Sequence, residues 1–294
     1  MMKRPFEALA LATLTLLALP ALAQESASID QQGSNGTATI KQEHLLSGAS
    51  ASITQGPGSG NLGIIEQAGN QADAAIDQGG DNQAARILQH NDGGSATILQ
   101  HGAGNSADIV QEVVGGIAKV RQEGRGNTVT IAQRITDAFA DVTQLGTNNK
   151  ASISELNGTI LGSTVYQNGT GNVADVDLSG DENQAGAHQV GTDNSAATNV
   201  HGGSRLSGIV DQNGSNNVGE IDLTGTTSAA QISQTGTGNK AFITSAGDGN
   251  FATIVQGGRN NWAKIDQLGN GLTATITQNT LAPGGGNYAR IVQR

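Results

Sequence analysis

The sequence predicts an all-β fold, a β-solenoid of about twelve 22-residue rungs. Each rung is a strand–turn–strand unit, and the strands form two facing sheets. Three observations predict this. An Ala-x-Ile-x-Gln pattern recurs about every 11 residues along the 294-residue chain. Glycine is abundant, with 43 residues, whereas aromatic residues make up only 2%. The chain has no cysteine, so disulfides add nothing to its stability. We therefore expect a thin interior of small and aliphatic side chains.

The first 23 residues have the features of a secretory signal peptide. Lys3 and Arg4 precede an apolar run over residues 8–19, and Ala21-Leu22-Ala23 has the small-residue pattern of a cleavage site. A membrane-spanning helix needs about 20 apolar residues, so this run is too short and we expect no transmembrane segment. We expect cleavage after Ala23, which leaves a repeat domain over residues 24–294.

The strands are predicted from the repeat itself. The central position occurs 24 times, with Ile or Val at 22 of them, and 19 of the 24 residues two positions earlier are Ala. Two positions later, 19 of the 24 residues are Gln. A period of two places Ala, Ile and Gln on one face of a strand and the variable residues on the other. The expected core anchors include Ile98, Ile109, Ile131, Ile232, Ile254, Ile265 and Ile276.

The turns are predicted from Gly-x-x-Asn segments, because Gly and Asn tolerate the positive φ of tight reversals. These segments follow every second strand, and looser turns follow the others, so the true period is 22 residues. Residues 22 apart should then lie directly above one another. The best-formed turn residues include Gly102, Asn105, Gly124, Asn127, Gly236 and Asn239.

Stacking at this period sorts the Gln residues into two columns. One column is unbroken and contains Gln31, Gln55, Gln78, Gln100, Gln122, Gln144, Gln167, Gln189, Gln212, Gln234, Gln256 and Gln278. The other column is interrupted by Glu155, Leu178, Val200, Leu223 and Ser245. Stacked Gln side chains can form amide ladders, as in cross-β assemblies, so we expect an amyloid-forming solenoid ordered by the unbroken column.

The two ends of the repeat domain have no distinct capping sequence. The first strand contains Ala27, Ile29 and Gln31, and the last carries the same pattern over residues 289–293. Soluble solenoids usually have atypical polar caps. A strand without a cap is a template for another chain, so we expect self-association at these ends.

The motif resembles the curlin repeat. Residues 95–111, Ser-Ala-Thr-Ile-Leu-Gln-His-Gly-Ala-Gly-Asn-Ser-Ala-Asp-Ile-Val-Gln, carry its Ser, Gln-x-Gly-x-x-Asn and Ala-x-x-x-Gln elements, and residues 261–267 are similar. The resemblance covers about residues 27–293, unusually long for this family. It implies a secreted bacterial functional-amyloid subunit that polymerises into curli-type surface fibres (pili or fimbriae) for adhesion and biofilm matrix. The dominant Ala-x-Ile-x-Gln repeat is similar to that of the minor, nucleating curlin.

The resemblance also implies partners. These are further copies of the chain, other curlin-like subunits, and an outer-membrane secretion and nucleation machinery that delivers the chain through the periplasm to the cell surface. Whether the chain is a bulk subunit or a nucleator stays open.

Other function classes find little support. The net charge of −10 argues against nucleic-acid binding, which needs basic surfaces. The glycine-rich segments at 58–63 and 169–174 match dinucleotide-binding loops only in spacing, since no strand–helix unit surrounds them. The sequence shows no catalytic pair and no metal-ligand spacing, so we expect no enzyme activity, no metal and no cofactor.

The alternative function is a monomeric extracellular binding β-solenoid, ice-binding or adhesin-like. An ice-binding face needs a regular outward array, usually of Thr. The outward residues just before successive anchors are instead irregular, with Arg86, Thr97, Asp108 and Lys119 in sequence. This irregularity favours the fibre subunit.

Overall fold

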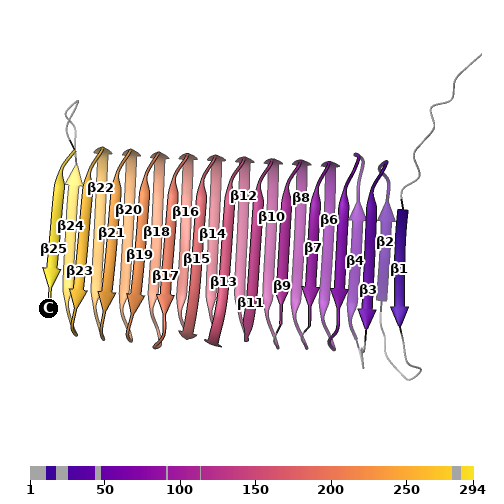
Figure 1. Cartoon of the computed structure of the whole chain (residues 1–294), viewed down its shortest axis with the longest axis horizontal. Coiled ribbons are helices and arrows are strands. Elements are labelled where there is room, and N and C mark those ends of the chain that lie inside the picture. The colour runs from indigo at the N-terminus through magenta and orange to yellow at the C-terminus, as the bar shows by residue number, and fades with distance from the viewer. Residues whose placement is uncertain (1–10, 18–25, 44–47, 91, 113, 280–285) are drawn as a thin grey trace, which may run out of the picture.

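The computed structural model describes residues 11–17, 26–43, 48–90, 92–112, 114–279 and 286–294. Within these residues all secondary-structure elements are β-strands, and the strands lie across a single long rod (Figure 1). The chain runs from one end of the rod to the other, so strands adjacent in sequence lie on opposite sheets. The predicted all-β solenoid of about twelve turns is confirmed.

The described strands form two parallel sheets. The 12-stranded sheet contains β2 (Ser26–Gln31), β4 (Ser50–Gln55), β6 (Asp73–Asp81), β8 (Ser95–Ala103), β10 (Ile117–Arg125), β12 (Phe139–Thr147), β14 (Gly162–Thr170), β16 (Gln184–Thr192), β18 (Ser207–Ser215), β20 (Ala229–Thr237), β22 (Phe251–Arg259) and β24 (Thr273–Asn279).

The 13-stranded sheet faces it. It contains β1 (Leu11–Leu17), β3 (Thr37–Glu43), β5 (Leu62–Gln67), β7 (Ala84–Gln89), β9 (Ser106–Gln111), β11 (Thr128–Thr136), β13 (Lys150–Thr159), β15 (Val173–Asp181), β17 (Ser195–His201), β19 (Val218–Thr224), β21 (Lys240–Ala246), β23 (Trp262–Leu268) and β25 (Tyr288–Gln293).

The register places equivalent residues of successive rungs beside one another. Between β8 and β10, Ile98 pairs with Val120 and Gln100 with Gln122. The same pairing of anchor with anchor continues through both sheets, because side chains of period two fix which face of each strand is buried. The result is a parallel, in-register cross-β stack built from one chain.

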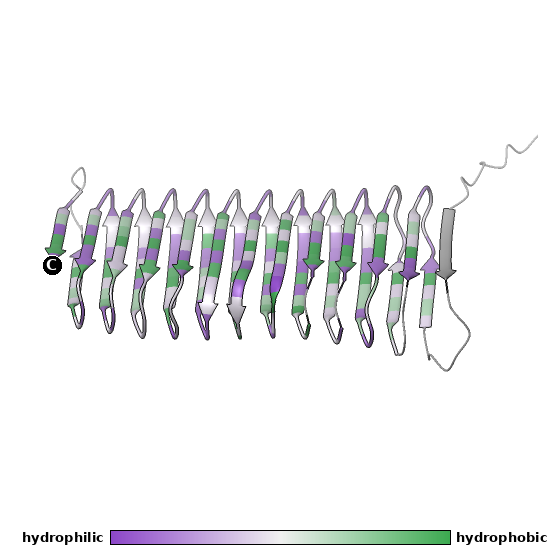
Figure 2. Cartoon of the chain, turned by 60° about the horizontal axis from the view of Figure 1, so that its bottom comes forward, coloured by the Kyte–Doolittle hydropathy of each residue, from purple (hydrophilic) through white to green (hydrophobic). Residues whose placement is uncertain are grey.

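The core is the thin layer between the sheets. Interior strands show the alternating pattern of buried and partly exposed residues that the repeat predicts, and apolar and polar residues alternate along the strands (Figure 2). The seven predicted anchors are all buried, from fully covered Ile98 to Ile276, which is 4% exposed. Each contributes an aliphatic side chain, whose full burial is worth about 1.5–3 kcal/mol.

One departure from the regular spacing lies in β13. The β13–β15 pairing shifts register between Glu155 and Gly158. Asn157 and Ile160 have φ near +59° and +55°, and Leu161 is buried at the turn. The extra residue is absorbed here as a β-bulge. The anchor spacing from Val142 to Val165 is consequently one residue longer than the regular 22.

Part of the segment assigned to the signal peptide forms the edge strand β1. It pairs in parallel with β3, with Leu14 opposite Ile40 and Leu16 opposite Gln42. The predicted cleavage site at Ala23 lies outside the described residues. In the part of the chain that the structure describes, no helix is long and apolar enough to cross a membrane.

Candidate functional site

The unbroken Gln column forms a continuous hydrogen-bonded ladder through the 12-stranded sheet. From Gln31 to Gln278, each side-chain amide Nε2 donates to Oε1 of the Gln in the next rung, at 2.7–3.0 Å. Every member after Gln31 is buried. Because all donors point the same way, the ladder has a direction along the rod.

The same amides also join the two sheets. The second proton of Nε2 is donated to a backbone carbonyl of the facing sheet: Gln100 to Ala84 O at 3.0 Å, and Gln122 to Ser106 O at 3.1 Å. Both N–H groups of a buried amide are thereby satisfied, which avoids the cost of roughly 1–3 kcal/mol for an orphan polar group. The sequence pattern predicted the stacking of these residues but gave no sign of this cross-sheet bond.

The Gln column of the 13-stranded sheet is interrupted. It runs from Gln42 to Glu155 through bonds of 2.7–2.9 Å. Above Glu155 the column positions are Leu178, Val200 and Leu223, all fully buried. Amide contacts resume where Ser245 Oγ donates to Gln267 Oε1 at 3.2 Å. Side-chain packing therefore replaces the ladder over three rungs.

Glu155 stands at the lower boundary of that apolar block. Its Oε2 accepts from Gln133 Nε2 at 2.8 Å, while its buried Oε1 makes no hydrogen bond among the described residues. Burial raises the pKa of Glu155 to about 7. The Gln133 amide and the nearby Ser163 hydroxyl favour the charged form and offset part of this shift, although Ser163 Oγ lies outside hydrogen-bond geometry.

The asparagines of the turns form a third column, which sequence reasoning missed. Asn105 Oδ1 accepts from the Asn127 backbone N–H at 3.0 Å, and Asn127 Nδ2 donates to Gly146 O at 3.0 Å. The same accepting contact repeats up to Asn261. Asn105, Asn127 and Asn239 are buried and do not have the positive φ expected of them. Their recurrence at the period of the Gln column was the available signal.

The turn glycines are required by close backbone stacking. Gly102, Gly124 and Gly236 have φ of +119°, +119° and +112°. A Cβ on Gly102 would lie 1.9 Å from Gly124 O, and one on Gly236 would lie 2.0 Å from Gly258 O. Any other residue would therefore clash with the backbone of the next rung as well as strain its own backbone.

The two ends of the rod are chemically complementary. At the C-terminal end, Gln278 and Gln293 donate to the facing backbone at Trp262 O and Thr273 O, and no further amide follows them in the described chain. At the other end, Gln42 Oε1 is buried without a hydrogen-bond partner among the described residues. One end therefore offers amide donors and the other offers amide acceptors.

Metal-ligating side chains are scattered along the rod. Among the described residues, no three His, Asp or Glu side chains gather closely enough to hold a metal ion. The His188 Nδ1 atom lies 3.9 Å from Asp211 on the outer face, as a pair rather than a cluster.

Comparison with known proteins finds the curlin associated repeat, which matches residues 225–257 and 247–279. These segments include strands β20 to β24, where both Gln columns and the Asn column are present. No curated protein matches the chain. Together with the repeat geometry, the repeat match over residues 225–279 supports a curlin-family assignment.

Proposed function

We propose that the chain is a secreted, self-assembling functional-amyloid subunit that forms curli-type fibres for surface adhesion and biofilm matrix. The single observation that carries the proposal is the direction of the amide ladders. A fibre forms when the donor end of one copy stacks on the acceptor end of the next.

The polarity of the ladders defines how two copies meet. The Gln278 amide would donate to Gln31 of the next copy, and Gln293 would donate to Gln42, whose Oε1 has no hydrogen-bond partner among the described residues. Two donor ends or two acceptor ends placed together would leave buried amide groups unpaired. Growth is therefore head to tail.

The end strands support the same junction. Ala27 and Ile29 at one end and Ala289 and Ile291 at the other are only partly buried, although they match interior residues that are fully covered. Stacking another rung on each end buries these side chains and pairs the open strand edges.

The role of β1 follows from its position. The signal segment holds the sheet edge beside β3, and it places Leu16 opposite Gln42. Because β1 occupies the edge of β3, removal of the signal peptide after Ala23 would open this edge to β25 of another copy, with its Gln293. N-terminal sequencing of the extracellular protein should begin at Gln24. An extracellular protein that begins at Met1 would contradict the proposed opening of the acceptor end by cleavage.

Two roles within a fibre are compatible with the repeats, namely bulk subunit and nucleator. The curlin-repeat family is structural, and we place the chain at the cell surface after export by a curli-type outer-membrane machinery. Seeding of a second curlin-like chain at low molar ratio would identify a nucleator. Assembly only with itself would identify a bulk subunit.

The primary test is fibre formation by residues 24–294 diluted from denaturant. We expect thioflavin-positive fibres with a cross-β diffraction pattern near 4.7–4.8 Å. A chain that stays monomeric at all concentrations would instead support the monomeric binding solenoid, ice-binding or adhesin-like.

A paired variant tests the junction. The double change Gln278→Leu and Gln293→Leu removes both amide donors at the C-terminal end and should block elongation from wild-type seeds. The control is Thr277→Leu, because Thr277 neighbours Gln278 on β24 but is exposed. Equal elongation by the double variant and the control would contradict the head-to-tail junction.

A further inference from the structure

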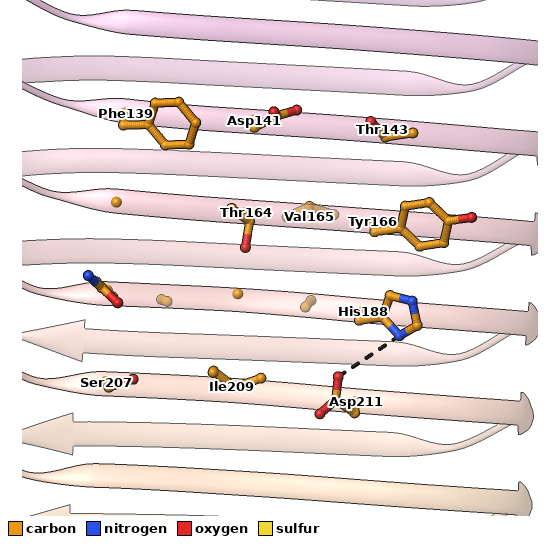
Figure 3. Close-up of a pocket in the computed structure, with 15 residues that line it drawn as sticks. Phe139, Asp141, Thr143, Thr164, Val165, Tyr166, His188, Ser207, Ile209 and Asp211 are labelled. Carbon is orange, nitrogen blue, oxygen red and sulfur yellow. Dashed lines mark ion pairs between the residues drawn. The ribbon is translucent and has the colours of Figure 1, made fainter.

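We propose that a hollow on the outer face of the 12-stranded sheet binds an uncharged saccharide. The hollow lies over β12, β14, β16 and β18 (Figure 3) and has a volume of about 660 Å³. Ligand pockets usually have volumes of about 300–1,000 Å³. The site faces away from the amide columns, so its occupancy does not depend on the proposed assembly.

Two outward-facing glycines border the hollow. Gly162 occupies the first outward position of β14 and Gly186 the second outward position of β16. Neither has the positive φ that would require glycine. A Cβ on Gly162 would meet nothing closer than Gln184 Cγ, at 3.8 Å. The backbone would accept a side chain at Gly162, and the missing side chain itself leaves the space.

Apolar and aromatic groups border this space. Phe139 and Ile209 lie on the outer two of the four strands and are 37% and 43% exposed. The Tyr166 and His188 rings stack along one side, with centroids 5.0 Å apart and planes inclined by 18°. In a chain with seven aromatic residues, two of them border this one hollow. Exposed rings beside a cavity offer apolar contact area to a flat ligand.

The polar groups of the rim select among ligands. Asp141 and Asp211 are hydrogen-bond acceptors when ionised, whereas the hydroxyls of Thr164 and Tyr166 can donate or accept. The two carboxylates disfavour an anion. A sugar ring presents an apolar face to the rings and hydroxyl donors to the carboxylates, so it matches both parts of the site.

Strand addition by a peptide is excluded at this place. Strands β12, β14, β16 and β18 are each paired on both sides within the sheet, so their backbone groups are already used. A ligand here must be recognised by side chains alone, whereas strand addition needs an open edge.

The experiment titrates cellotriose, maltotriose and di-N-acetylchitobiose into residues 24–294, both before and after assembly. Isothermal titration calorimetry and saturation-transfer NMR should show saturable binding of at least one of them. The Gly162→Thr variant fills the hollow and should weaken that binding at least about tenfold, the equivalent of about 1.4 kcal/mol. Tyr166→Ala should weaken it as well.

The control is Ala229→Thr, which places the same threonine side chain in the same column three strands away and outside the hollow. It should bind like the unchanged chain. Unchanged strand content in circular dichroism establishes that Gly162→Thr still folds. The proposal is overturned if the unchanged chain binds none of the three sugars, or if Gly162→Thr binds as well as Ala229→Thr. Two other results would also overturn it. The first is that the unchanged chain binds tetramethylammonium and no sugar. The second is that Gly162→Thr loses lateral bundling of the rods while no sugar binding is seen.

Discussion

The two sheets solve the same stacking problem in different ways. In the 12-stranded sheet, the column beside the anchors is Gln at every rung and is hydrogen-bonded from Gln31 to Gln278. In the 13-stranded sheet, the equivalent column changes to Leu178, Val200 and Leu223 in its middle, and these are fully buried. The rod is therefore held by an amide ladder on one side and by alternating ladder and apolar packing on the other.

The difference shows what a stacked polar column demands. An apolar residue needs no partner, so a block of consecutive apolar residues costs amide bonds only at its two boundaries. At the lower boundary one carboxylate oxygen of Glu155 has no hydrogen-bond partner in the part of the chain that the structure describes. At the upper boundary the Ser245 hydroxyl donates to Gln267. Scattered single replacements would leave orphan amides at many rungs.

The largest expected effect comes from breaking the unbroken column. Gln122→Ala leaves the Gln100 amide N–H without its acceptor and Gln144 Oε1 without its donor, and it removes the bond to Ser106 O. At roughly 1–3 kcal/mol for each buried orphan, the loss should be several kcal/mol. We expect a much longer thioflavin lag and slower elongation at matched concentration, and the same direction for Gln212→Ala.

Ser245→Ala is the matched control, because it removes one 3.2 Å contact in the broken column. From the sequence, Leu178→Ala is expected to be equally mild. The structure changes this expectation, since Leu178 is fully buried and its truncation leaves a cavity worth about 2–5 kcal/mol. If Ser245→Ala slowed assembly as much as Gln122→Ala, the ladder would not be the ordering element.

The boundary residue Glu155 predicts a pH dependence. Its folded pKa of about 7 lies above the ordinary value of 4.5, so between these values the folded chain binds more protons than the unfolded chain. The free energy of unfolding should therefore fall as pH rises from about 4.5 to 7 and level off above, by up to about 3 kcal/mol. Denaturant titrations of the soluble chain across this range measure it.

Glu155→Gln separates this effect from the titration of exposed carboxyls. A Gln at this position keeps the bond from Gln133 and carries no charge, so the variant should be more stable than the unchanged chain at pH 8 and nearly equal at pH 4.5. A stability difference that does not vary with pH would show that Glu155 is not the responsible group.

The sequence predicted the fold well because one periodicity determines it. Period two within strands and period 22 between rungs place Ile98 under Val120 and Gln100 under Gln122, as observed. The asparagines were interpreted as turn residues, because local propensity does not report a partner one rung away. The bulge after Glu155 and the hollow at Gly162 were also missed. Each comes from a single departure from the repeat, and its effect depends on the residues of the neighbouring strands.

The smallest expected effect concerns the middle of the rod. Around residues 176–200 the anchors are Val176, Ala187 and Thr198, all buried, and of the two Gln columns that of Gln189 alone continues as a ladder here. Over residues 87–111 the anchors are all Ile, and both columns are hydrogen-bonded. Because replacing a large aliphatic side chain by Ala in a packed core costs about 2–5 kcal/mol, the middle should open more readily.

Hydrogen exchange of assembled fibres should show faster backbone exchange over 176–200 than over 87–111. The substitution Ala187→Ile sharpens the test. If the middle opens because its anchor side chains are too small, this variant should exchange more slowly around residue 187. Equal protection of the two segments would mean that the single ladder of the 12-stranded sheet is sufficient to hold a rung whatever its anchors are.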